Sequence, residues 1–253
     1  MAERVLVTGA TGFIGRHIPA LLQAHGLATH ITARSAASTT PGMTAHQVDL
    51  LQQEDAQRLI KDVRPDIIIH TAWYVAHGRF WTAPENTDWL EASTALAAYA
   101  AEAGARRLGE MAEARARFSV TWARLFHLFG PGENPARLVP SIMIALREGR
   151  EAACASGRPV RDFISTQAAA AAIAALATSD VTGPVNIASG APISIAAMAR
   201  LIGHISGRPY LVRLGALPDR PNEPPYMVAH TGRLRREVGF TAPVSLAAEL
   251  SKL

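Results

Sequence analysis

A glycine-rich turn near the start of the chain constrains the fold more than any other feature. Residues 8–15 read TGATGFIG and follow an apolar run at residues 4–7. Apolar side chains then recur at helical spacing, at Ile14, Ile18, Leu21 and Leu22. A buried strand, a glycine turn and an amphipathic helix in this order predict the first βα unit of a parallel sheet.

The spacing of the three glycines also predicts a binding site. Gly9 permits the tight turn, Gly12 lets the backbone approach a pyrophosphate, and Gly15 lets the helix pack closely on the strand. The free N–H groups and the positive dipole end of the helix favour a phosphate there. The residues assigned to this dinucleotide site are Gly9, Thr11, Gly12, Phe13, Ile14 and Gly15.

Strand and helix patterns alternate through the first half of the chain. The expected strands are residues 30–33, 47–50, 67–70 and a part of 120–129. The expected helices are residues 54–63 and 92–103. This alternation predicts an α/β fold, a Rossmann-like doubly wound parallel sheet.

The pattern of predicted elements changes after Gly130-Pro131-Gly132: the elements become short and are separated by glycine and proline. Helices are expected at 140–148 and 194–205, the second capped by Ser194, and strands at 160–165 and 185–188. We therefore expect a small C-terminal substrate lobe beside the sheet. The expected dinucleotide-binding domain is 1–130 plus parts of 160–190, and the expected lobe is 131–159 and 191–253.

Composition excludes several classes of function. The chain has 253 residues, of which 49% are hydrophobic, and its formal charge is only +4. The arginines are scattered, which argues against nucleic acid as a partner. Cys154 is the single cysteine, so a disulfide framework or a multi-cysteine metal site is excluded, and no metal ligand is assigned. No apolar run is long enough for a membrane span, and a cytoplasmic protein is expected.

Five further blocks carry a resemblance that runs nearly end to end. They are VDL at 48–50, IHTA at 69–72, ARLFHLFGPG at 123–132, VRDFI at 160–164 and GPVNIASG at 183–190. In this order, and after the glycine turn, they resemble the extended short-chain dehydrogenase/reductase family. These are the NAD(P)-dependent epimerases and dehydratases of nucleotide sugars.

The resemblance implies a site for the cofactor and one for a nucleotide-sugar substrate. Beyond the glycine turn, the cofactor-contacting positions that it implies are Asp49, Leu50, Thr71, Ala72 and Trp73. Arg161 and Arg220 match arginines that hold the sugar-nucleotide diphosphate, a task that suits the guanidinium fork. His127 stands where the family usually has asparagine. A homodimer is also expected from the family.

The choice of cofactor depends on one position. Dinucleotide sites that prefer NAD carry an acidic residue about twenty positions after the glycine motif. Here residues 33–35 read ARS, without an acid, and Arg34 can accept a 2′-phosphate. We therefore predict NADP, with NAD as the alternative.

The catalytic signature of the family is absent from the sequence. The family's chemistry uses a tyrosine with a lysine four residues later, which serve as general acid or base beside the nicotinamide. No tyrosine here is followed by lysine at that spacing: the four are Tyr74, Tyr99, Tyr210 and Tyr226. Residues 103–108 resemble the approach to the family's fifth strand, and 109–113 resemble the late part of its catalytic helix. The fifth strand and the Tyr–Lys segment are therefore expected to be missing between Leu108 and Gly109.

Three explanations stay open at this point. The sequence lacks residues that the full protein carries, or the deletion is natural and the protein is non-catalytic, or residues 92–117 form one continuous helix into the next strand. Two functions follow. The first is a nucleotide-sugar epimerase, dehydratase or 4-ketoreductase that transfers hydride at a sugar carbon. The second is a non-catalytic NADP-binding regulatory or scaffold protein.

Overall fold

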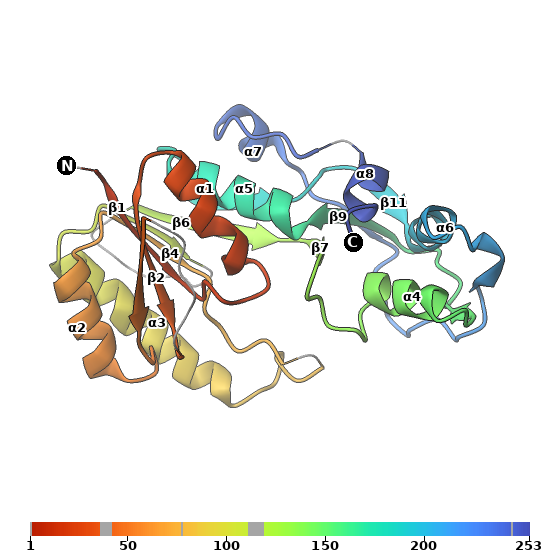
Figure 1. Cartoon of the computed structure of the whole chain (residues 1–253), viewed down its shortest axis with the longest axis horizontal. Helices are drawn as coiled ribbons and strands as arrows, with labels where there is room; N and C mark the ends of the chain where they lie inside the picture. Colours follow the sequence, from red (N-terminus) through yellow and green to blue (C-terminus); the bar gives the residue numbers. More distant parts are fainter. Residues whose placement is uncertain (1, 36–41, 77, 111–118, 244) are drawn as a thin grey trace. The chain divides into compact units, whose positions relative to one another are not determined.

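The protein forms two compact units in a computed structural model that describes residues 2–35, 42–76, 78–110, 119–243 and 245–253 (Figure 1). The first unit comprises Met1–Arg124, Ala170–Val185 and Arg233–Phe240. The second comprises Leu125–Ala169, Asn186–Gly232 and Thr241–Leu253. Unlike the expected bounds, these units place residues 125–130 in the second unit and 233–240 in the first, and of residues 160–190 the first unit takes 170–185.

The first unit is built on a seven-stranded sheet in the order β10-β6-β5-β4-β1-β2-β3. Its strands are β1 (Arg4–Thr8), β2 (Ala28–Ala33), β3 (Met43–Gln47), β4 (Ile67–His70), β5 (Arg107–Glu110), β6 (Ser119–Leu125) and β10 (Gly183–Ile187). Neighbouring strands from β3 through β6 pair in parallel. The Rossmann-like doubly wound fold is thus confirmed.

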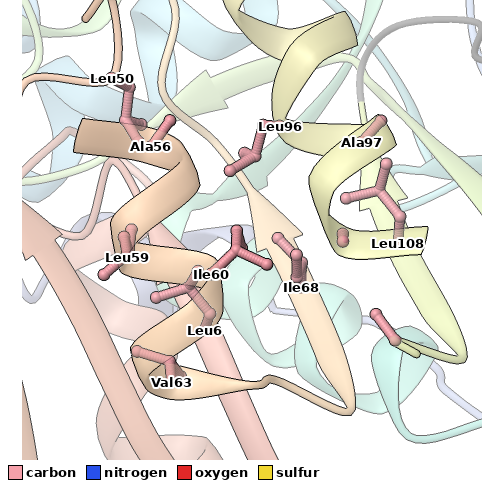
Figure 2. Close-up of a cluster of buried hydrophobic side chains, with 12 residues drawn as sticks. Leu6, Leu50, Ala56, Leu59, Ile60, Val63, Ile68, Leu96, Ala97 and Leu108 are labelled. Atoms are coloured by element: carbon pink, nitrogen blue, oxygen red, sulfur yellow. The ribbon is translucent and has the colours of Figure 1, made fainter. Parts of the chain in front are cut away.

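Helices cover both faces of this sheet (Figure 1). They are η1 (Gly15–His17), α1 (Ile18–Ala24), α2 (Gln53–Val63), α3 (Glu85–Glu102), α5 (Thr166–Ala177) and α7 (Gly232–Arg236). Helices α2 and α3 pack on one face, and α1 lies on the other. Figure 2 shows the core under α2 and α3, where Leu59 and Leu96 meet Leu6 and Ile68 of the sheet.

Sequence pattern explains α2 well. Ala56, Leu59, Ile60 and Val63 recur at helical spacing and are all buried. The helix ends at a left-handed residue, Arg64, with φ of 47°. The expected helix at 54–63 is confirmed to within one residue.

The helix after the glycine turn is interrupted, which its spacing did not predict. Gly15–His17 forms a 3-10 turn, and α1 begins only at Ile18. Pro19 lacks the N–H that an unbroken α-helix would need at its position, so it fits only the first turn of a new helix.

The connection after β4 corrects two expectations. Helix α3 ends at Glu102, and Gly104 adopts a positive φ of 85°, so a continuous helix over 92–117 is wrong. Strand β5 is present across the Leu108–Gly109 junction and pairs in parallel with β4 and with β6. The fifth strand is therefore not missing. Residues 111–118, on which the rest of the expected catalytic helix fell, lie outside the described residues.

The second unit carries a smaller sheet and its own core. Its strands are β7 (His127–Phe129), β8 (Ala152–Ala153), β9 (Val160–Ser165), β11 (Pro192–Ser194), β12 (Val212–Arg213) and β13 (Tyr226–Met227). Its helices are α4 (Leu138–Arg147), α6 (Ile195–Ile205), η2 (Pro209–Leu211) and α8 (Leu246–Leu250). Strand β9 pairs with β7, β11 and β13. The fully buried Phe129 belongs to the core beneath α4 and α6.

Three further outcomes bear on the predictions. Ser194 caps α6, since its hydroxyl accepts the Ala197 N–H at 3.1 Å, as expected. The strand expected within 120–129 is two strands, β6 and β7. Helix α5 was not predicted, because its alanine-rich sequence has little contrast between faces. Within the described ranges, no helix is both long and apolar enough to cross a bilayer.

Candidate functional site

The glycine turn lies at the carboxyl end of β1 and is packed too tightly for side chains. Gly9 has φ of 68°, and a Cβ there would lie 2.6 Å from the backbone nitrogen of Ala72. A Cβ at Gly15 would overlap the Gly9 carbonyl. The Gly12 N–H donates to the Gly9 carbonyl at 2.9 Å, and Gly12 itself is exposed. The turn therefore offers open backbone beside two close-packed glycines.

The other assigned residues of the turn differ in exposure. Thr11 is exposed, whereas Phe13 and Ile14 are half-buried. The Arg16 guanidinium lies 5.9 Å from the centre of the Phe13 ring. The turn thus presents a hydroxyl, exposed backbone and a cation at one place in the chain.

The end of β4 adjoins this turn. The Thr71 hydroxyl donates to the Thr8 carbonyl at 2.6 Å, and Ala72 packs against the core. The Trp73 indole N–H donates to Asn86 Oδ1 at 3.2 Å. The structure thus brings Thr71 and Ala72 against Gly9, as their shared assignment to one site requires.

A buried polar chain fixes β1, β4 and α3 behind the turn. The Thr8 hydroxyl lies 2.7 Å from His70 Nδ1, and His70 Nε2 lies 2.9 Å from Ser93 Oγ. The Ser93 hydroxyl donates to the Trp89 carbonyl, so Nε2 carries the proton and Nδ1 accepts from Thr8. Burial lowers the pKa of His70 to about 4. His70 is therefore a neutral structural residue.

Arg34 and Asp49 follow β2 and β3. Arg34 is exposed directly after β2, and no acidic residue occurs between Glu3 and Asp49. The strand expected at 47–50 is shifted, because β3 ends at Gln47 and the Asp49 carboxylate accepts the Leu51 N–H in a tight turn. Leu50 is buried in the core (Figure 2), so only its backbone can reach a ligand.

The three predicted substrate residues lie in the second unit, and two are buried or half-buried. The Arg161 side chain is 3% exposed and donates to Glu223 Oε1 at 2.7 Å. Arg220 is exposed, three residues before Glu223 in the same loop. His127 lies edge-on to Phe163, with ring centres 5.5 Å apart. Burial and the nearby Arg161 and Arg137 guanidiniums lower the pKa of His127, and Asp162 and Glu223 oppose them.

Sequence reasoning did not single out the residue that organises this region. The fully buried Asp162 carboxylate accepts the Ser189 N–H and the Gly190 N–H, each at 2.9 Å, and the Ala229 N–H at 3.2 Å. The Ser189 hydroxyl also donates to it, at 2.5 Å. Asp162 therefore ties two loops to β9 beside Arg161. Its place inside the VRDFI block was the available signal.

The tyrosines and lysines are distributed over both units. Tyr74 follows β4 and is half-buried, Tyr99 packs on the α3 core, and Tyr210 and Tyr226 are exposed. The two lysines are Lys61, at the end of α2, and Lys252, which pairs with Glu249. Only residues 111–118 separate the parallel strands β5 and β6, and they contain neither residue type.

Comparison with known proteins bears on the family and the fold. The sequence model of the NAD dependent epimerase/dehydratase family matches residues 5–112 and 98–188. Similar solved structures include the UDP-glucose 4-epimerase of Thermus thermophilus in complex with NAD. It has a TM-score of 0.81 and 19% identity, covering 98% of this chain and 97% of that one.

A second similar structure is the UDP-N-acetylglucosamine 4-epimerase of Methanobrevibacter ruminantium, in complex with UDP-N-acetylmuramic acid. It has a TM-score of 0.84 and 19% identity, covering 100% of this chain and 97% of that one. At these identities the structures support the fold, and the family match spans well over half of the chain. The chain therefore belongs to the NAD dependent epimerase/dehydratase family.

Proposed function

We propose that this protein binds NAD(P) and a nucleotide sugar and exchanges hydride at a sugar carbon, as an epimerase, dehydratase or 4-ketoreductase. The observation that carries the proposal is the glycine turn packed against Thr71 and Ala72 at the end of the sheet. Gly9 and Gly15 leave no room for side chains, whereas Gly12 is exposed. That is the local geometry that a dinucleotide pyrophosphate needs.

We propose NADP as the preferred cofactor, with NAD as the alternative. The bound nicotinamide would supply the hydride acceptor or donor. The backbone of residues 9–15 would hold the pyrophosphate of the cofactor. Asp49, Thr71 and Trp73 would contact other parts of the cofactor. Arg34 supports the choice of NADP because it is exposed at the end of β2, where an acid would disfavour a 2′-phosphate.

We propose a nucleoside diphosphate sugar as the substrate. The two similar enzymes named above act on UDP-sugars, and this chain has guanidiniums at Arg161 and Arg220. Glu223 holds Arg161 in place, while Arg220 is exposed on the same loop as Glu223. Such guanidiniums suit diphosphate oxygens. A cytoplasmic homodimer is part of the proposal, on the family resemblance alone.

One observation favours the second candidate, a non-catalytic NADP-binding regulatory or scaffold protein. The sequence has no Tyr–x–x–x–Lys, and eight residues connect β5 to β6. A parallel crossover normally takes a dozen or more. An intact mass of 26.9 kDa would show that the purified protein is this chain and that the Tyr–Lys segment is absent.

Calorimetric titration tests the binding part of the proposal. Wild-type protein is titrated with NADPH and NADH, and then with UDP in the presence of the tighter cofactor. We expect saturable NADPH binding that weakens at least fivefold in Arg34→Ala and is unchanged in the control Arg150→Ala, an exposed arginine of the other unit. Failure to bind either cofactor would refute both candidates.

Turnover separates the two candidates. A panel of UDP-, dTDP- and GDP-sugars is incubated with the cofactor-loaded protein, and products are separated by chromatography. Conversion of any sugar supports the enzyme, whereas cofactor binding without conversion supports the non-catalytic candidate.

A further inference from the structure

A carboxyl group beside the predicted substrate residues has one oxygen without a partner. The Glu133 side chain is only 4% exposed, and its Oε1 lies 3.2 Å from the Arg137 guanidinium. Within the part of the chain that the structure describes, the buried Oε2 has no hydrogen-bond partner of ordinary geometry. Leaving such an atom unsatisfied is costly, so native proteins rarely do so without a reason.

The backbone and the ion pair hold this carboxyl in place. The Glu133 N–H donates to the Gly130 carbonyl at 3.1 Å, which closes the turn after β7. The Arg137 N–H donates to the Asn134 carbonyl at 2.9 Å, and α4 begins at the next residue. Glu133 therefore lies between a closed turn and an ion pair, and cannot swing into water without breaking the pair.

A second buried polar atom, next to the same turn, is on Thr166. Thr166, fully buried at the start of α5, packs its hydroxyl against the Cα of Gly130. Its Oγ1 likewise has no hydrogen-bond partner among the described residues. Two buried oxygens beside Gly130, one on the turn and one on α5, thus have no hydrogen-bond partner among the described residues.

Arg137 links Glu133 to the predicted substrate residues. Its guanidinium pairs with Glu133 and is close enough to lower the pKa of His127, as Arg161 does. Glu133 therefore belongs to the same charged cluster of the second unit as His127 and Arg161. Arg137 is half exposed, so the cluster is open to a ligand at this side chain.

The chemistry of the carboxyl selects the ligand group. Burial raises the pKa of Glu133 to about 7, while Arg137 and the Gly130 backbone act in the opposite direction. The protonated and the ionised forms of Glu133 are therefore both populated near neutral pH. A phosphate would be repelled by the ionised form, whereas a hydroxyl can donate to the ionised form and accept from the protonated form.

We propose that Glu133 Oε2 binds a hydroxyl group of the nucleotide sugar, as a ligand-contacting residue beyond those that the family resemblance implies. This proposal rests on the proposed function, because it takes the nucleotide sugar as the ligand. The hydroxyl is either one of the hexose or the 2′-hydroxyl of the ribose, and the same chemistry serves both.

Calorimetry of the cofactor-loaded protein with three ligands tests the proposal. The ligands are UDP-glucose, UDP and 2′-deoxy-UDP, and the variants are Glu133→Ala and Glu133→Gln. The control is Glu148→Ala, which removes an exposed carboxylate just after α4 that pairs with Arg150. Loss of one hydrogen bond to a partly charged group corresponds to roughly tenfold weaker binding. Glu133→Gln keeps an acceptor for Arg137, so it separates the ligand contact from the loss of the ion pair.

The three ligands identify the source of the hydroxyl. A roughly tenfold loss in Glu133→Ala for UDP-glucose alone, with a smaller loss in Glu133→Gln because its amide N–H can still donate to a hydroxyl, supports a hexose hydroxyl. A loss for UDP-glucose and UDP, but not for 2′-deoxy-UDP, supports the ribose. Unchanged affinities, or equal losses for all three ligands, would overturn the proposal. If wild-type protein binds no UDP ligand at all, the proposed function fails instead, which is a distinct result.

Discussion

The buried His70 chain makes a quantitative prediction about acid stability. His70 is held neutral between Thr8 and Ser93, and burial lowers its pKa from 6.5 to about 4. A base with a depressed folded-state pKa binds fewer protons when folded than when unfolded. Its contribution to stability is therefore complete above about pH 6.5 and is lost as the pH falls toward 4.

The size of the effect follows from the shift. Each pKa unit corresponds to about 1.4 kcal/mol, so lowering the pH from 7 to 4.5 costs the folded state about 2 to 3 kcal/mol at this residue. Other groups also titrate over this range, so the comparison needs a variant. His70→Gln replaces the ring with an amide that does not titrate, and it should cost about 1 to 3 kcal/mol at pH 7 through lost hydrogen bonds.

Urea unfolding followed by tryptophan fluorescence measures the difference. Between pH 7 and pH 4.5, wild type should lose about 2 to 3 kcal/mol more unfolding free energy than His70→Gln. His25→Gln is the matched control, because His25 is exposed and its ring lies 2.8 Å from the Leu21 carbonyl oxygen. A difference between wild type and His70→Gln that stays constant with pH would refute the account of His70 as a neutral buried base.

Three substitutions test other parts of the structure. Gly9→Ala should lower the melting temperature and abolish measurable dinucleotide binding. The reason is that φ of 68° and the nearby Ala72 nitrogen exclude a side chain at this position. Retained binding would contradict the packing of the turn. Asp162→Asn should cost about 2 to 4 kcal/mol in urea unfolding, because three backbone N–H groups lose a charged acceptor. Ser194→Ala should cost about 1 kcal/mol in the same assay, and no change would show that the cap of α6 is unimportant.

Elements with a clear apolar periodicity, or with a run of β-branched residues, were predictable from the sequence. The triple isoleucine of β4 and the apolar spacing of α2 match the structure to within one residue. The alanine-rich α5 was not predicted because alanine is neither a strand signal nor a marker of one helix face. Strand β3 was misplaced because residues 43–47 (MTAHQ) lack the run of β-branched residues that usually marks a strand.

The glycine turn was the predictable part of the site, and the side-chain pairings were not. Gly9 and Gly15 are required by backbone conformation and close packing, which a local motif encodes. The Arg161–Glu223 pair and the loops held by Asp162 join residues dozens of positions apart, so they depend on the tertiary fold. The partnerless oxygen of Glu133 depends on burial, which no motif in the sequence encodes.

The short connection after β5 separates binding from catalysis in this chain. Strand β5 keeps parallel partners on both sides, so the central sheet does not need the family's catalytic helix for its pairing. The glycine turn packs on Thr71 and Ala72, where β1 and β4 end. Eight residues without tyrosine or lysine cannot supply the Tyr–Lys pair. Cofactor binding by this chain should therefore survive even where sugar turnover does not, and any turnover must use a proton-transferring group other than that pair.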